Sequence, residues 1–175
     1  NIYYKQEKIR EWAPAGMRFW TKIQHNDGSF DEFYPNERGW TGPTGFLLYA
    51  MLKSYMLLEK QGEFPSDFKE QFFTTCRKAA DYIIKYDEHG VLANHHAMAV
   101  LPVYYAYHVL QQKDLLEGYE KKLEEFLSYH TKEGWSLEYD GADIGYLSAT
   151  VSFLGKVYKL NGDERLKKVM DESVE

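Results

Sequence analysis

Three almost wholly apolar stretches alternate with amphipathic ones, and this alternation constrains the fold more than any other feature. The apolar stretches are FLLYAMLKSYMLL (46–58), AMAVLPVYYAYHVL (97–110) and YLSATVSFLGKVYKL (146–160). In residues 66–86 and 114–130, by contrast, apolar residues recur every three or four positions. An all-round apolar helix needs neighbours on every side, whereas an amphipathic helix needs one. The pattern predicts an all-α fold with inner apolar and outer amphipathic helices.

The loops that precede the apolar helices repeat a motif. Aligning DGSFDEF with EGWSLEY pairs Gly28 with Gly134 and Glu32 with Glu138, and Gly90 opens the middle loop in the same way. A degenerate repeat of this kind indicates successive helical hairpins. We therefore expect an incomplete (α/α) toroid of about three hairpins, with the polar loops gathered at one rim where they form a concave site.

Length and charge narrow the class of protein. The 175 residues fit a single α/α-toroid-like domain spanning residues 1–175, which we expect to be a piece of a longer chain because Asn1 is not Met. A net charge of −6 without a basic cluster opposes nucleic-acid binding. No signal peptide or transmembrane segment is visible, so membrane insertion is not expected and localisation stays open. The single Cys76 fits a core position.

Asn94 and His95 lie where the second apolar helix begins. Asn is among the best N-caps, so Asn94 has a purely structural interpretation. The functional one is that its amide neutralises a carboxylate while the His95 imidazole moves a proton. His96 is expected to pack or orient. The spacing of the histidines does not match a metal site, so neither a metal nor a cofactor is expected.

The loop EYDGADIGY supplies further candidates. Tyr139 and Tyr146 are candidate general acids or bases, provided that their hydroxyls lie beside a cationic or imidazole group. Glu138 and Asp143 are candidate substrate-binding groups. Asp-Gly and Asp-Ile-Gly are also ordinary turn sequences, and Asp143 is suited to cap the following helix.

Rim residues that could hold a sugar come mainly from the first loop. The rings of Tyr34, Trp40 and, in the third loop, Trp135 are able to stack on sugars, although a core position is equally compatible with each. Arg38 is suited to pair with a substrate carboxylate, or with a neighbouring Glu.

The segments ANHH and LEYDGADIGYLSATVSFLGKVYKL resemble the helical toroid domain of polysaccharide lyases, in particular the heparinase II/III-like and alginate-lyase-like proteins. The resemblance spans Leu92 to Leu160. It implies β-elimination on uronate-containing glycans. It also implies that Asn94 neutralises the uronate carboxylate, that His95 is the base or its partner, and that Tyr146 or Tyr139 is the acid and base. The implied partner is a carbohydrate, and the oligomeric state is left open.

Two alternatives remain. One is a glycoside hydrolase on the same scaffold, which would need two carboxyls about 5 to 10 Å apart. The other is a non-catalytic helical module that binds glycan or protein through its aromatic rim. The carboxyl candidates for the hydrolase are Asp31, Glu32, Glu138, Asp140 and Asp143.

Overall fold

The structure is a computed structural model that describes the chain except residues 1–5, 33, 36–40, 88–91, 140 and 175. Within the described residues the β structure consists of isolated bridges, so the predicted all-α class is confirmed. The helices are α1 (Glu7–Ile23), α2 (Thr41–Lys60), the short 3-10 helix η1 (Ser66–Phe68), α3 (Lys69–Lys85), α4 (Ala93–Leu110), α5 (Lys113–Leu127), α6 (Ile144–Asn161) and α7 (Glu164–Val174).

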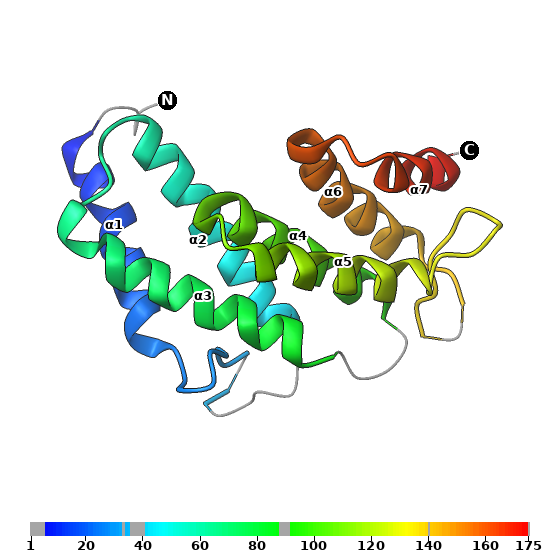
Figure 1. The fold of residues 1–175 in the computed structure, drawn as a ribbon, viewed down its shortest axis with the longest axis horizontal. Coiled ribbons are helices and arrows are strands. Elements are labelled where there is room, and N and C mark those ends of the chain that lie inside the picture. The colour runs from blue at the N-terminus through cyan, green and yellow to red at the C-terminus, as the bar shows by residue number, and fades with distance from the viewer. Residues whose placement is uncertain (1–5, 33, 36–40, 88–91, 140, 175) are drawn as a thin grey trace.

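Helix α4 is the centre of the molecule. It packs against α2, α3, α5 and α6, and most of its side chains are buried. In Figure 1, α3 and α5 lie in front of α2 and α4. Helix α6 packs on α4 and α7 packs on α6, and both are drawn at the upper right near the C-terminus. For α4 the sequence prediction of an apolar helix covered all round is therefore confirmed.

Helices α2 and α6 depart from that prediction. Although both are almost as apolar as α4, each leaves part of its surface uncovered. Phe46 and Leu57 of α2 are 47% and 51% exposed, and Ile144 of α6 is 88% exposed. The reason is that α4 and the amphipathic helices cover these two helices on one side only.

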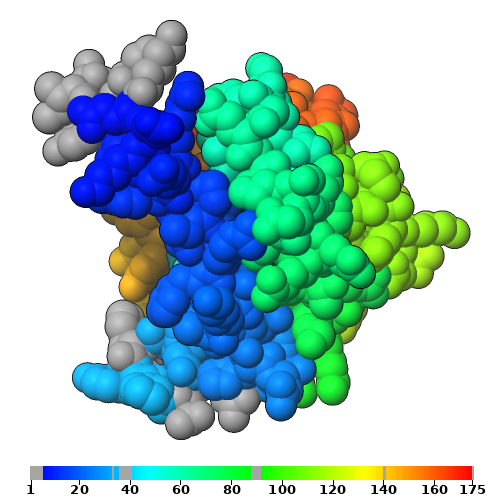
Figure 2. All heavy atoms as spheres, turned by 90° about the vertical axis from the view of Figure 1, so that its left-hand side faces the viewer, coloured from blue at the N-terminus to red at the C-terminus, as the bar shows by residue number. Residues whose placement is uncertain are grey.

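The amphipathic helices behave as their periodicity predicts. Helix α3 buries Phe72, Cys76 and Ile83 and presents charged residues to solvent. Cys76 is a core residue, and burial raises the pKa of its thiol well above the usual value. Helix α1 runs through Pro14 without a break and lies alongside α3 in Figure 2. No helix of the described residues combines the length and apolarity that a membrane crossing needs.

The starts of the inner helices lie at one end of the molecule. A Cβ on Gly42, the second residue of α2, would lie 3.4 Å from Nδ1 of His95 in the first turn of α4. The Ala93 N–H at the start of α4 donates to the Leu137 carbonyl, 3.0 Å away, in the loop that leads to α6. The first turns of α2 and α4 and the Leu137 segment of the third loop therefore lie next to one another, and we call this end of the molecule the rim.

Two glycines of the repeat occupy equivalent places. Gly28 has φ +96° and Gly134 has φ +84°, a region that favours glycine. Each also touches the backbone of an outer helix. A Cβ would lie 2.2 Å from the Lys78 carbonyl oxygen of α3 at Gly28, and 2.1 Å from the Glu172 carbonyl oxygen of α7 at Gly134. The aligned glycines thus allow two loops to lie directly on the outer helices.

Candidate functional site

A buried carboxylate joins the third loop to the start of α4. Glu138 Oε1 accepts a hydrogen bond from the Asn94 backbone N–H at 2.6 Å, and Oε2 accepts from Asn94 Nδ2 at 2.7 Å. Both residues are buried. The N-cap residue of α4 is Leu92, which provides no side-chain bond. Glu138 therefore caps α4 from a distant loop.

This contact corrects the structural interpretation of Asn94. Asn94 lies inside the first turn of α4 and is a donor to the cap, so it is not the N-cap residue itself. Its side-chain amide is held by the Glu138 carboxylate, although one of the two amide hydrogens is not required for that bond. The sequence pattern missed this arrangement because the capping group lies 44 residues further along the chain.

Opposing effects act on the proton affinity of Glu138. Burial raises the pKa of its carboxyl above the usual value, and the nearby charge of Asp143 adds to that shift. The hydrogen bonds from Asn94 and the proximity of His95 act in the opposite direction. Because burial is the larger effect, Glu138 holds a proton more tightly than an exposed glutamate does.

His95 connects the capped start of α4 to α2. Its side chain is half-buried, and its ring lies beside the first turn of α2 at Gly42. It is also close enough to Glu138 to act on that carboxyl electrostatically. An imidazole held between a helix start and a carboxyl group is suited to move a proton.

Two tyrosines form the exposed side of the site. Their ring centroids lie 6.3 Å apart, and Tyr139 is 62% and Tyr146 39% exposed. The hydrogen bond with Tyr139 raises the pKa of Tyr146 above its usual value. Asp143 caps α6, since its Oδ1 accepts from the Tyr146 N–H at 2.8 Å, which confirms the predicted capping role.

The remaining candidates are dispersed. Tyr34 is 71% exposed on the first loop. Trp135 is half-buried, and its indole N–H donates to Glu133 at 2.9 Å. Asp31 accepts from the imidazole of His25, with 2.6 Å between Oδ1 and Nε2. Arg38, Trp40 and Asp140 lie outside the described residues.

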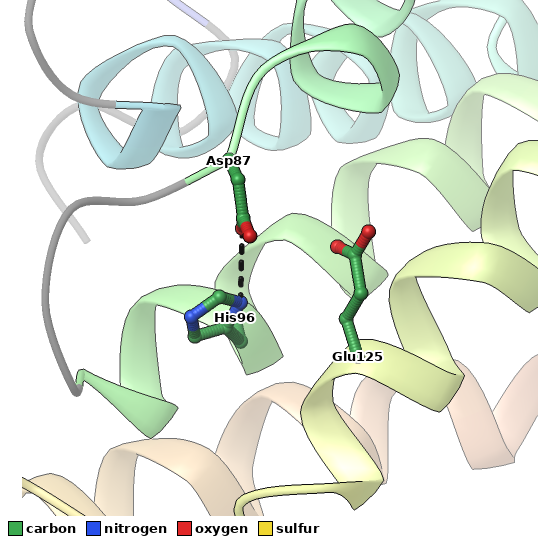
Figure 3. A group of neighbouring side chains, drawn as sticks. All are labelled: Asp87, His96 and Glu125. Carbon is green, nitrogen blue, oxygen red and sulfur yellow. Dashed lines mark ion pairs between the residues drawn. The ribbon is translucent and has the colours of Figure 1, made fainter.

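A second polar cluster, not anticipated from the sequence, lies between α3, α4 and α5. One potential ligand atom each from Asp87, His96 and Glu125 falls within 4.8 Å of the others. His96 Nδ1 lies 3.4 Å from Asp87 Oδ1, and Figure 3 marks this pair with a dashed line. The His96 ring stacks on Tyr129, in keeping with the packing role expected for it. The members are spread over three segments, so no spacing motif could have revealed them.

Lys122 supplies positive charge to this cluster. Its side chain is 2% exposed, and its Nζ donates to Glu125 Oε2 at 2.7 Å and to the Tyr86 carbonyl at 3.1 Å. The same ammonium lies 3.9 Å from Asp87 Oδ1. The acidic groups therefore surround a cation that the chain itself provides, which gives the cluster a structural role.

We expect Lys122→Met to lower the free energy of unfolding by about 2 to 3 kcal/mol, because it leaves Glu125 without its buried partner. This is below the cost of breaking a fully buried pair, since the Glu125 side chain is 24% exposed. Lys121→Met is the matched control, because Lys121 also pairs with Glu125, at 3.6 Å, but is 55% exposed. Urea denaturation measures both variants, and equal losses would contradict the assignment.

With this geometry described, comparison with known proteins gives one match. A family model described as pectic acid lyase matches residues 2–91, which are 90 of the 175 residues and thus just over half of the chain. The chain belongs to the pectic acid lyase family. No curated protein and no solved structure matches it.

Membership of the pectic acid lyase family confirms a relationship to polysaccharide lyases in general. It does not extend to the heparinase II/III-like group in particular. The matched residues include the first loop and helix α2 of this chain, but the match ends before Asn94. Roles for Asn94, His95, Glu138 and the two tyrosines therefore rest on the geometry described above.

Proposed function

We propose that this chain is the helical part of an enzyme that cleaves pectic acid, a polymer of galacturonate, by β-elimination. The observation that carries the proposal is the match of residues 2–91 to the pectic acid lyase family. The likeness of residues 92–160 to heparinase II/III-like and alginate-lyase-like domains supports the same reaction class from the other half of the chain. The toroid arrangement of the hairpins is part of this proposal.

The reaction requires a base and an acid on a uronate residue. The base removes the proton on C5, and the electron pair forms the C4–C5 double bond. The C4–O4 bond breaks, and the leaving O4 takes a proton from the acid. We assign the base to His95 and the acid to Tyr146, with Tyr139 as its hydrogen-bonding partner.

The assignment of Tyr146 as the acid follows from its environment. A phenol keeps its proton at neutral pH, and the hydrogen bond with Tyr139 raises the pKa of Tyr146 further. A hydroxyl that keeps its proton suits donation to a leaving oxygen better than removal of a carbon-bound proton. The imidazole of His95 has a ring nitrogen that can accept a proton, and the ring lies beside the first turn of α2 and close to the Glu138 carboxyl, which is why we assign it as the base.

Asn94 and Glu138 support the site in this proposal. The Glu138 carboxyl holds the Asn94 amide and the start of α4, so the pair positions His95, the next residue. The amide hydrogen of Asn94 that is not required for the Glu138 bond is the group that would neutralise a uronate carboxylate. Protonation of Glu138, which its raised pKa favours, would remove the repulsion between the two carboxyl groups.

Sugar units beyond the cleaved bond need further contacts. We assign stacking to Tyr34, which is 71% exposed, and to Trp40 and Trp135. Arg38 is assigned to pair with a substrate carboxylate. Asp143 contributes indirectly, since its Oδ1 holds the backbone N–H of Tyr146.

The test is incubation of the protein with polygalacturonate, followed by the ultraviolet absorbance of the unsaturated product. We expect Tyr146→Phe to lower kcat by about 10²-fold, because it removes the proton donor and leaves the ring in place. Tyr158→Phe is the control on the same helix, since Tyr158 packs against the core, and it should keep wild-type kcat.

Other products would point to other functions. New reducing ends without the absorbing product would indicate the hydrolase in place of the lyase. Binding of polygalacturonate without any cleavage would indicate the non-catalytic module. Equal rates for Tyr146→Phe and the wild type would remove Tyr146 from the mechanism while leaving the reaction class standing.

A further inference from the structure

The surface left uncovered on α2 and α6 is formed by rings and lysines. We call it the aromatic–lysine face. The ring of Phe46 on α2 and that of Phe153 on α6 pack edge-on with centroids 5.8 Å apart, and Tyr49 packs edge-on against Tyr105 at 5.0 Å. Its members are Phe46, Tyr49 and Lys53 of α2 and Phe153 and Lys156 of α6, and the buried ring of Tyr105 of α4 packs against Tyr49.

The two lysines lie over the rings. Nζ of Lys156 is 5.7 Å from the ring centroid of Tyr49 and 5.4 Å from that of Phe153. Nζ of Lys53 is 6.0 Å from the ring centroid of Tyr105. These distances fall in the range of cation–π contacts. They place two ammonium groups on one partly apolar surface built from α2 and α6.

This face continues from the rim where the proposed catalytic groups lie. On α6, Tyr146, Phe153 and Lys156 are spaced by seven and three residues, which places them along one side of the helix. Lys53 lies twelve positions after Thr41 and Lys156 twelve positions after Ile144, the first residues of α2 and α6. At 1.5 Å per residue, the backbone positions of both lysines lie about 18 Å along their helix axes from the first residues of α2 and α6.

Among the residues that the structure describes, no carboxylate forms an ion pair with Lys53 or Lys156. On the outer helices Arg18, Arg77 and Arg165 are paired with carboxylates. Within the described part of the chain, Lys53 and Lys156 contact rings and, for Lys156, the Ser152 hydroxyl at 2.8 Å. Burial lowers the pKa of Lys156, and the charge of Lys159 adds to that effect. An uncompensated positive charge in a chain of net charge −6 favours an anionic ligand.

We propose that the aromatic–lysine face binds an acidic oligosaccharide, with uronate carboxylates paired to Lys53 and Lys156 and sugar faces on the rings of Phe46 and Tyr49. This inference rests on the proposed function and extends its substrate site from the rim along the inner helices. Carboxylates supply the anions that the lysines lack, while the apolar faces of pyranose rings match exposed aromatic rings.

Binding measured without turnover tests the proposal. Isothermal titration of the protein with a galacturonate pentamer is compared with its fully methyl-esterified form, which keeps the sugar and removes the charge. We expect the double variant Lys53→Gln/Lys156→Gln to bind the acidic pentamer at least about tenfold more weakly. The control Lys22→Gln/Lys132→Gln removes the same charge from two exposed lysines elsewhere and should bind like the wild type.

The outcomes separate this proposal from the proposed reaction. Wild-type binding that the Lys53/Lys156 double variant retains, or equal affinity for the acidic and the esterified pentamer, overturns the aromatic–lysine face as the site. Absence of saturable binding to the wild type overturns it as well. Selective loss in the double variant supports it even where polygalacturonate is not cleaved, and in that case only the lyase assignment fails.

Discussion

Glu138→Ala is expected to lower the free energy of unfolding by about 3 to 5 kcal/mol. The change removes the acceptor of two buried donors, the backbone N–H and the side-chain amide of Asn94. A buried donor left without a partner costs about 1 to 3 kcal/mol. The first turn of α4 also loses its cap, because Leu92 offers no side-chain replacement. Chemical denaturation with an unchanged m-value measures the loss.

Two companion variants make this prediction specific. Glu133→Ala removes a carboxylate from the same loop, but that residue is exposed, so we expect a change below about 1 kcal/mol. Glu138→Gln keeps one acceptor oxygen for two donors, so its free energy of unfolding should lie between those of Glu138→Ala and the wild type. A Glu138→Ala protein as stable as Glu133→Ala would show that the buried cap does not hold α4.

Glu138 should also make the stability of the folded protein depend on pH, and the direction of that dependence can be predicted. Burial raises the pKa of Glu138 above 4.5 in the folded protein, so the folded state binds the proton more tightly than the unfolded chain. Its contribution to stability is therefore greatest at low pH and is lost as pH rises through the folded pKa. The stability of the wild type relative to Glu138→Gln should decline over that range, and a rise would contradict the buried environment of the carboxyl.

The sequence predicts those parts of the structure that depend on local periodicity and turn chemistry. The helical layers follow from where apolar residues recur, and the cap by Asp143 follows from its place before α6. The equivalence of Gly28 and Gly134 follows from the repeated loop motif. In each case the deciding residues are close in sequence or aligned by the repeat.

The contacts that build the site depend on tertiary structure. The Glu138–Asn94 bonds and the grouping of Asp87, His96 and Glu125 join residues from separate hairpins. Hydropathy also misled at α2 and α6, since an apolar helix face has the same composition whether protein covers it or leaves it exposed. The aromatic–lysine face was missed for this reason.

Alanine at Gly28 is expected to lower the free energy of unfolding by about 2 to 5 kcal/mol. A non-glycine residue at φ +96° costs about 1 to 2 kcal/mol. The new Cβ would also lie 2.2 Å from the Lys78 carbonyl oxygen, so the loop must move away from α3. Overpacking against a backbone atom that cannot rotate aside costs about 1 to 3 kcal/mol more. Thermal and chemical denaturation measure the sum.

Other glycines of the chain separate the two causes. Gly62 has φ +69° and nothing within 4 Å of its Cβ position, so Gly62→Ala should show only the conformational cost, about 1 kcal/mol. Gly16 lies exposed within α1 with open space around it, and alanine there should raise stability by up to about 1 kcal/mol. A Gly28→Ala loss no larger than that of Gly62→Ala would refute the close approach of the loop to α3.

Gly134→Ala should lower the free energy of unfolding for the same two reasons, but by less than Gly28→Ala does. Its Cβ would lie 2.1 Å from the Glu172 carbonyl oxygen of α7. Helix α7 packs mainly on α6, whereas α3 packs on α1, α2, α4 and α5 and has no room to retreat. The strain at Gly134 is therefore relieved by partial release of α7. Hydrogen exchange should show this as lost protection confined to residues 164–174, and protection lost evenly over the chain would contradict it.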